Sequence, residues 1–221
     1  MSTIILIPAR LESTRFPEKM LADLNGKTLI RNVWEKCQSF GYPSYIVSDS
    51  RKVLNQSPLC FFTQPAENGT ERISLATDGS QVTATKIINV QGDMPDITLD
   101  IIKAVEQKLD DYSVSTAYTK MSKENQQDPN SVKMIHNGDT AHWFCRAPLE
   151  YGDHHLGVYG YRLEEIATYR NLKKYKEEEK EQLEQLRWIQ NDVTIGVTEV
   201  DFNGIEINTP QDLERWKQNN G

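Results

Sequence analysis

The chain has 221 residues, of which 38% are hydrophobic and 26% are charged, with a formal net charge of −7. This composition is typical of an ordinary globular protein with one large domain. The acidic balance disfavours general nucleic-acid binding, which needs a basic surface. No apolar run is long enough to cross a membrane, and the N-terminus lacks the plan of a signal peptide. We therefore expect neither nucleic acid nor membrane as a partner.

The three cysteines are odd in number and far apart in the sequence, at Cys37, Cys60 and Cys145. This spacing does not suit a disulfide framework or a zinc site. It predicts reduced, mostly buried thiols in a cytoplasmic protein.

The first half of the chain alternates short apolar segments with helical patterns. The continuous apolar run Ile4–Ile7 is typical of a strand buried on both faces. Apolar residues at helical spacing over residues 27–40 predict a helix that Gly41 ends. Further strands are expected at residues 44–49, 59–64 and 86–93, and helices at 69–79, with Thr70 as candidate cap, and at 98–109. Alternating strands and helices predict βαβ units in a largely parallel sheet.

The second half has a different pattern, with strand-like segments and few helices between them. We expect strands at residues 113–119, 131–135, 142–146 and 155–162, which would extend or cap the sheet. We then expect a charged helix near residues 175–190, a strand at 193–200 and a last helix from Thr209. The run from Lys173 to Lys180 is interpreted as a solvated helix face with opposite charges one turn apart.

Ligands of an open parallel sheet bind at the carboxyl ends of its strands. This rule selects the loop after the first strand and the segments 63–72 and 91–96. In the first loop, "PARLESTRFPEK", Arg10, Arg15 and Lys19 could neutralise a polyphosphate, although the loop has none of the glycines that phosphate loops normally use. The alternative is a surface loop whose charges are simply solvated.

The segment "NVQGD" ends an apolar strand with an amide, a glycine and a carboxylate. Asp93 could bind Mg²⁺, which prefers carboxylate oxygen and keeps several waters. Alternatively, Asp93 is a turn residue that bonds its own backbone. The segment "NTPQDL" is explained as a helix start, with Thr209 as cap and Pro210 in the first turn. The four histidines lack metal-ligand spacing, and no local nucleophile signature is present.

Taken in order, six segments of this chain resemble those of one family, the 3-deoxy-manno-octulosonate cytidylyltransferases, also called CMP-KDO synthetases. "IPARLESTRFPEK" is similar to the family's I-P-A-R-x-x-S-T-R-L-P-G-K, "NGTERI" to S-G-T-E-R-L, and "NVQGDMP" to N-V-Q-G-D-E-P. "HLGVYGYR" and "LEQLR" match their counterparts, and "INTPQDLER" resembles V-D-T-P-E-D-L-E-R. The resemblance therefore covers nearly the whole chain.

This resemblance implies an α/β fold of the Rossmann-like nucleotide-diphospho-sugar transferase type. Its sheet would be mostly parallel, with a β-rich part for sugar binding and dimerisation. The chain would be a single domain, residues 1–221, in which residues 1–110 bind nucleotide and residues 111–221 bind sugar and form a homodimer. The implied reaction joins CTP and the acidic sugar KDO into CMP-KDO and pyrophosphate, with Mg²⁺ as cofactor. Such an in-line step needs alignment and charge neutralisation more than a covalent nucleophile.

The resemblance also implies roles for individual residues. The triphosphate would be held by Arg10, Arg15 and Lys19, within a nucleotide site that includes Pro8, Ala9, Gly69, Thr70, Arg72 and Gln91. With Asp93, the three cations make up the expected catalytic set, and Asp93 and Asn208 are the expected metal ligands. The sugar's carboxylate would meet Arg146, and its hydroxyls His155, Tyr159, Glu184 and Gln185.

Four positions depart from the family pattern. Asn208 stands where the family has an aspartate metal ligand; its amide adds no charge, and Glu206, on the same face by strand alternation, could compensate. Glu18 replaces a glycine of the first loop, and Met94 replaces an acid next to Asp93. The segment between Arg146 and His155 is shorter than in the family. These departures keep open an 8-amino or other 2-keto-3-deoxy sugar acid as substrate, or a nucleotide-binding protein that has lost catalysis.

Overall fold

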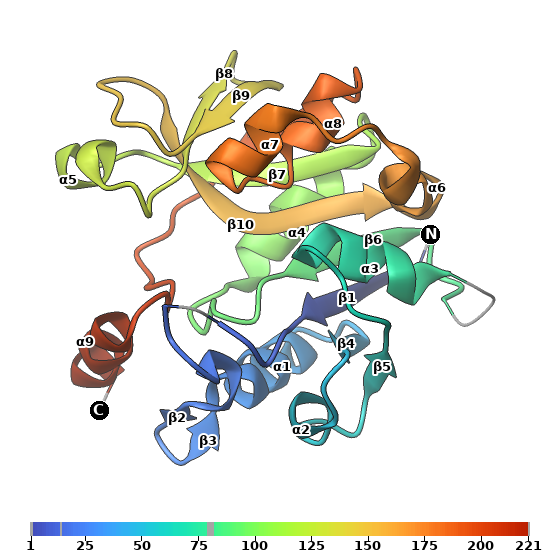
Figure 1. Cartoon of the computed structure of the whole chain (residues 1–221), viewed down its shortest axis with the longest axis vertical. Helices are drawn as coiled ribbons and strands as arrows, with labels where there is room; N and C mark the ends of the chain where they lie inside the picture. The colour runs from blue at the N-terminus through green and yellow to red at the C-terminus, as the bar shows by residue number, and fades with distance from the viewer. Residues whose placement is uncertain (1, 14, 79–81, 221) are drawn as a thin grey trace.

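A nine-stranded mixed sheet runs through the centre of the molecule (Figure 1). The computed structural model describes residues 2–13, 15–78 and 82–220. Seven strands follow the order β11-β7-β10-β6-β1-β4-β5. Their bounds are β1 Thr3–Pro8, β4 Ser44–Ser48, β5 Cys60–Phe62, β6 Lys86–Val90, β7 Val114–Thr119, β10 Asp153–Arg162 and β11 Ile195–Glu199.

Most neighbouring strands of this path are parallel, as the sequence predicts. β1 pairs in parallel with both β4 and β6, β4 with β5, and β7 with β11. The exception is β10, which lies antiparallel between β6 and β7. A hairpin of β8 (Lys133–His136) and β9 (Ala141–Cys145) extends from β10. The expected α/β fold is confirmed, with the added strands in the second half.

Helices cover both faces of the sheet. The buried strand β1 explains why: Ile5 and Ile7 face one apolar cluster, whereas Leu6 faces the other. The first cluster includes residues of α1 (Leu29–Ser39) and α4 (Leu99–Lys108), and the second includes residues of α3 (Gly69–Thr77), α6 (Leu163–Thr168) and α8 (Leu186–Gln190). A strand covered on both faces needs a continuous apolar run, which the sequence provides.

The remaining elements are short, except for α9, which is as long as α1. They are β2 (Asp23–Leu24), β3 (Lys27–Thr28), α2 (Arg51–Leu54), α5 (Lys123–Gln127), α7 (Lys176–Glu181), α9 (Pro210–Asn220) and the 3₁₀ turns Lys19–Leu21 and Tyr169–Asn171. α2, α5 and α6 were not anticipated, because helices of four to six residues show too little periodicity. Within the described ranges, no helix is both long and apolar enough to span a membrane.

Two local expectations are wrong. Asn68, not Thr70, caps α3: its side chain accepts a hydrogen bond from the backbone N–H of Glu71. The charged helix expected near residues 175–190 is two helices, α7 and α8, because Gln182 adopts a left-handed backbone (φ 55°) that ends α7. Glu178, in the middle of α7, is buried rather than solvated and pairs with Arg187 at 2.6 Å.

After β11 the chain leaves the sheet and returns to the first half. Figure 1 shows this segment passing down one side of the molecule to α9, which lies next to β2 and β3. Ile205 and Ile207 join the apolar cluster that includes residues of α1 and α4, and the backbone N–H of Ile207 donates to the carbonyl of Asp93 (2.9 Å). The cap at Thr209 is confirmed: Thr209 and Asp212 exchange side-chain hydrogen bonds with each other's backbone N–H.

The structure shows how the first loop accommodates Glu18. This residue has a left-handed backbone (φ 50°), a conformation in which glycine has no steric penalty. Its carboxylate lies 3.2 Å from the ammonium of Lys52 on α2, both side chains are exposed, and Glu18 lines neither cavity of the molecule. The carboxylate of Glu18 is therefore directed toward solvent, and the energetic cost of this residue is mainly the strain of its left-handed backbone.

We predict that Glu18→Gly stabilises the protein by about 0.5–1 kcal/mol. Relief of a left-handed backbone is worth about 1–2 kcal/mol, and the added freedom of glycine in the unfolded chain cancels part of that. Urea denaturation measures the change. Glu214→Gly, at an exposed position within α9, is the control and should destabilise by about 1 kcal/mol. Equal destabilisation by the two substitutions would contradict the assignment of strain to Glu18.

Candidate active site

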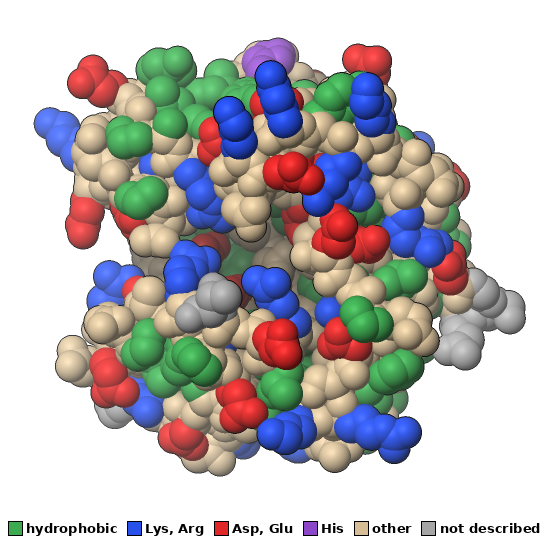
Figure 2. Space-filling view, viewed as in Figure 1, with side chains coloured by type: hydrophobic (Ala, Val, Ile, Leu, Met, Phe, Trp, Pro, Cys, Tyr) green, Lys and Arg blue, Asp and Glu red, His purple; other side chains and the backbone are tan. Residues whose placement is uncertain are grey.

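Two adjoining cavities lie between the first and second halves of the chain. The larger has a volume of about 640 Å³ and the smaller of about 200 Å³. Figure 2 shows the hollow at the centre of this face, with Lys and Arg side chains around its rim. Six of the expected site residues line both cavities: Arg15, Gln91, Asp93, Arg146, Glu184 and Asn208. The cavities are therefore two parts of one site.

The structure brings nearly all of the expected site residues to these cavities. The larger one is also lined by Pro8, Ala9, Arg10, Lys19, Gly69 and Arg72, and the smaller one by His155, Tyr159, Gln185, Met94 and Glu206. Thr70 is the exception, since it is buried behind the wall of the site and bonds to Glu184 and Tyr161.

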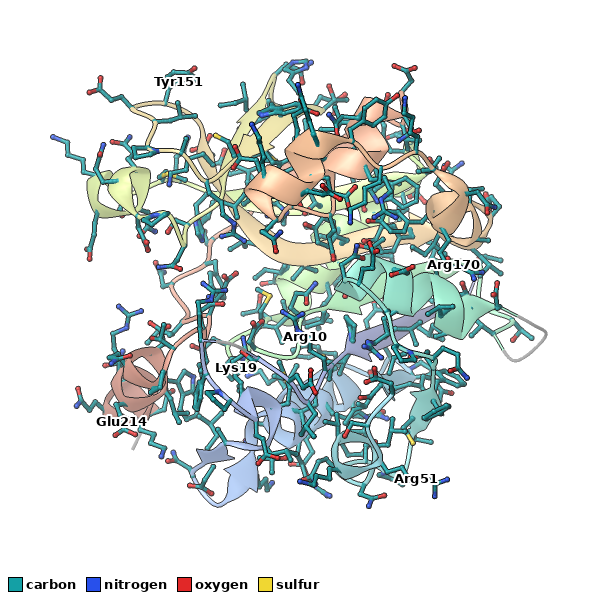
Figure 3. The ribbon with its side chains drawn as sticks, viewed as in Figure 1. Arg10, Lys19, Arg51, Tyr151, Arg170 and Glu214 are labelled. Atoms are coloured by element: carbon teal, nitrogen blue, oxygen red, sulfur yellow. The ribbon has the colours of Figure 1, made fainter. Side chains whose placement is uncertain are left out.

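The first loop places its cations around the larger cavity. Lys19 is only 9% exposed, and its ammonium lies 2.6 Å from a carboxylate oxygen of Asp93 at the end of β6. Arg15 crosses between the halves and donates to the side-chain oxygen of Asn130 (2.7 Å). Figure 3 labels Arg10 and Lys19 at the centre of the molecule, where the two halves meet. The alternative of a simply solvated charge therefore fails for Lys19, whereas Arg10 and Arg15 are exposed at the edge of the cavity.

Two glycines allow the segments around Gln91 to approach closely. A Cβ on Gly69 would lie 3.3 Å from the Gln91 side-chain nitrogen and 3.4 Å from both Glu184 and Pro8. A Cβ on Gly157 would lie 3.0 Å from the Gln91 side chain on its other side. Because Gly69 and Gly157 have no side chains, the amide of Gln91 fits between them and lines both cavities.

Glu184 holds the start of α3 in place. Its carboxylate accepts from the backbone N–H of Gly69 (2.8 Å) and from the backbone and hydroxyl of Thr70 (3.2 and 2.8 Å). Burial raises the pKa of this carboxyl, and the hydrogen bonds from Thr70 and Gly69 counteract the shift. Acceptors at a helix N-terminus are stabilised by its unpaired N–H groups. Both oxygens of Glu184 are therefore engaged within the protein.

Arg72 is buried at the inner wall of the larger cavity. Its guanidinium donates to the hydroxyl of Thr63 (3.0 Å) and pairs with Asp49, which follows β4, at 3.2 Å. Sequence reasoning did not select Asp49, because a single carboxylate after a strand has no distinguishing pattern. The pair fixes the orientation of Arg72 and offsets part of its charge.

Arg146 lies at the junction of the cavities and is held by the main chain. Its Nε donates to the carbonyl of Glu181 (3.0 Å), and one terminal nitrogen to the carbonyls of Pro129 and Asn130 (both 3.3 Å). Burial lowers the pKa of this guanidinium, with a smaller contribution from the charge of Arg15. Among the described residues, no protein acceptor bonds to its second terminal nitrogen. One edge of the guanidinium thus remains available to a ligand.

His155 presents a neutral imidazole to the smaller cavity. Its Nε2 lies 3.0 Å from the hydroxyl of Thr116, which donates its own proton to the carbonyl of Val158 (2.7 Å). Nε2 must therefore carry the hydrogen, which leaves Nδ1 as an acceptor. Burial lowers the pKa of His155 to about 3, with a smaller contribution from His154. A neutral ring of fixed tautomer can accept from a sugar hydroxyl.

The residues around Asp93 can accommodate a magnesium ion. Within the described ranges, no cluster of three His, Cys, Asp or Glu side chains offers a complete metal site. Mg²⁺ instead takes one or two carboxylates together with water and substrate phosphates. Asp93 and Asn208 face the same cavity, and one oxygen of the nearby Glu206 carboxylate is buried without a hydrogen-bond partner in this part of the chain. This donor set fits a hard cation.

The chain is similar to known proteins over nearly its full length. A family model described as cytidylyltransferase matches residues 4–204. The 3-deoxy-manno-octulosonate cytidylyltransferase of Bartonella henselae is 35% identical over 237 residues, with 97% of each chain covered, and that of Nitratiruptor sp. is 34% identical, with 96% of this chain and 97% of the relative covered.

Solved structures agree with this similarity. The structure of CMP:2-keto-3-deoxy-manno-octonic acid synthetase complexed with CTP is 29% identical, with a TM-score of 0.90, and covers 99% of this chain and 98% of that chain. A 4-diphosphocytidyl-2C-methyl-D-erythritol synthase from Anaerococcus prevotii, at 9% identity and a TM-score of 0.68 over 99% of this chain and 97% of that one, shares the fold.

The buried imidazole of His155 predicts a loss of stability in acid. Below pH 6.5 the unfolded chain binds a proton on this residue that the folded chain does not bind until about pH 3. The free energy of unfolding of the wild type, relative to His155→Gln, should thus fall by about 1 kcal/mol between pH 7.5 and pH 5.5. Urea titrations of both proteins at the two pH values measure it. A constant difference between them would contradict a neutral His155.

Proposed function

The chain belongs to the cytidylyltransferase family, and we propose that it transfers CMP from CTP to the anomeric hydroxyl of KDO. Pyrophosphate is the second product, and Mg²⁺ is the cofactor. One observation carries this proposal: two cavities of different size adjoin at Asp93, and Lys19, which pairs with Asp93, lines the larger one together with Arg10. The larger suits a nucleoside triphosphate, and the smaller suits an acidic sugar.

The larger cavity has the charges that a triphosphate needs. Arg10, Arg15 and Lys19 line it from the loop after β1, and the protein as a whole is acidic. Arginine binds phosphate oxygens in a bidentate manner, whereas lysine acts as a point charge. The nucleoside would lie against Pro8, Ala9, Gly69, Arg72 and Gln91. A related solved structure, of a protein 29% identical to this one, is complexed with CTP, which supports this nucleotide.

The smaller cavity has features that suit a sugar acid. Arg146 offers the open edge of its guanidinium to a carboxylate, while His155 and Gln185 are polar groups buried in the wall. The aromatic ring of Tyr159 is 4% exposed and packs beside His155, with 5.2 Å between ring centroids. Glu184, expected to contact the sugar directly, would act mainly by holding Gly69 and Thr70. Relatives named for KDO, 34–35% identical, support this sugar acid.

The geometry suits a single displacement at the α-phosphorus. The anomeric hydroxyl would attack from the smaller cavity, and pyrophosphate would leave toward Arg10, Arg15 and Lys19. Asp93 and Asn208 would hold Mg²⁺, which when bound neutralises phosphate charge and aligns the two reactants. Lys19 would stabilise the charge that develops on the phosphate oxygens. No covalent enzyme intermediate is needed in this scheme.

We also assign the two halves of the chain different roles. Residues 1–110 would bind the nucleotide, and residues 111–221 would bind the sugar and form the contact surface of a homodimer. The second candidate substrate is an 8-amino or other 2-keto-3-deoxy sugar acid. It is favoured by the short turn between Arg146, after β9, and His155 in β10, because the residues at both ends of this turn line the smaller cavity.

We predict that the purified protein releases pyrophosphate from CTP when KDO and Mg²⁺ are both present. UTP in place of CTP, and omission of KDO, are the controls. Turnover compared between KDO and its 8-amino analogue decides between the two sugar acids. If CTP binds in calorimetry but no sugar acid releases pyrophosphate, the protein is a nucleotide-binding relative without catalysis, and the proposed reaction is wrong.

A further inference from the structure

We propose that Glu206 supplies a carboxylate to the metal site at Asp93 and thereby provides the charge that the amide of Asn208 lacks. The inference rests on the proposed function, because the ion in question is the Mg²⁺ that the CTP reaction needs. It concerns a different residue from the two expected ligands, and it makes Glu206 part of the site.

The path of the chain after β11 brings Glu206 to Asp93. Ile205 and Ile207 are buried in the core, so the alternating residues Glu206 and Asn208 project to the other side. The backbone N–H of Ile207 donates to the carbonyl of Asp93 (2.9 Å), which fixes this register. Glu206 and Asn208 therefore lie on either side of Ile207, whose backbone is bonded to that of Asp93. The side chains of Asp93, Glu206 and Asn208 all line the smaller cavity.

One oxygen of the Glu206 carboxylate lacks the hydrogen-bond partner that a buried acceptor needs. Its Oε1 is buried, and among the described residues no donor lies within hydrogen-bonding reach of it. A buried acceptor without a partner costs about 1–3 kcal/mol. The carboxylate has one main-chain donor, the backbone N–H of Gly157, and it lies near the charges of Asp93, Lys19 and Arg146. An incoming cation would satisfy the unpaired oxygen.

The surrounding charges favour a divalent cation at this place. Asp93 and Glu206 line the same small cavity, so their carboxylates repel each other when both are ionised. The cations nearby are already engaged: Lys19 is bonded to Asp93, and Arg146 to three main-chain carbonyls. A metal ion that takes oxygens from Asp93 and Glu206 removes the repulsion between them.

The ligand count agrees with this assignment. Asn208 can offer one neutral oxygen, and the affinity of oxygen sites for hard cations increases with the number of charged ligands. With Glu206 included, the site has two carboxylates and one amide. This is the range in which Mg²⁺ binds through few protein groups and keeps water and phosphate ligands.

Mn²⁺ binding, followed by electron paramagnetic resonance of the unbound ion, tests the proposal without turnover. The titrations use CTP and no sugar acid, and are repeated with Mn²⁺ alone. Glu206→Gln should weaken Mn²⁺ binding by at least about tenfold, the factor that loss of even an outer partner costs at metal sites. Glu214→Gln is the matched control, since Glu214 is exposed on α9 and lines neither cavity, and it should leave Mn²⁺ affinity unchanged.

A second substitution separates a missing charge from a damaged fold. In the Glu206→Gln background, Asn208→Asp restores a carboxylate next to Asp93 and should recover most of the Mn²⁺ affinity. In the wild-type background the same substitution should have a smaller effect, because the charge is already present. Unchanged Mn²⁺ affinity in Glu206→Gln, or a loss that Asn208→Asp does not recover, would overturn the proposal.

The same samples distinguish this inference from the proposed function. Calorimetry of CTP on the wild type tests the nucleotide site independently of Glu206. Absence of CTP binding would contradict the proposed function, whereas the titrations with Mn²⁺ alone would still decide the role of Glu206.

Discussion

The ion pair between Lys19 and Asp93 is the contact on which the arrangement of the site depends. It joins the loop after β1 to the end of β6, two adjacent strands at the centre of the sheet. The backbone of Asp93 also accepts from Ile207, so the segment that leads to α9 is fixed to the same residue. One aspartate therefore positions three segments that are far apart in the sequence. A partly buried charge of this kind needs its partner, because removal of either one leaves the other uncompensated.

The loop that carries Lys19 shows how side chains can replace a glycine-rich backbone. A phosphate loop with glycines offers N–H groups, whereas this loop offers two guanidinium groups and one ammonium. Where the resemblance implies a glycine, this chain has Glu18, and the backbone at that position is left-handed. The strain at Glu18 lies outside the cavities, and the acid faces Lys52. The loop thus keeps an electropositive inner face despite the added carboxylate.

Patterns along the chain predicted the sheet, since the apolar run of β1 and the helical spacing of α1 each reflect burial that is local in sequence. The same patterns missed α2, and they did not show that Gln182 would divide the charged helix. The motifs along the chain identified most of the residues that line the site, including Arg146 and Asp93. The motifs could not reveal which residues hold these side chains in place. Arg15, for example, is hydrogen-bonded to Asn130, which is 115 positions away in the sequence, and such contacts leave no local signal. Glu206 could be suspected from strand alternation, but its unpaired oxygen is visible only once the core positions of Ile205 and Ile207 are known.

Pyrophosphate release by Asp93→Asn, with CTP, KDO and Mg²⁺, tests the central claim most directly. The substitution keeps the size of the side chain and its turn geometry while it removes the charge that would hold the metal and that pairs with Lys19. We expect turnover to fall by at least about 100-fold, the scale for loss of one preorganised electrostatic group, with CTP binding retained in calorimetry. Turnover within a few-fold of the wild type would show that Asp93 is a turn residue and that the chemistry is organised elsewhere.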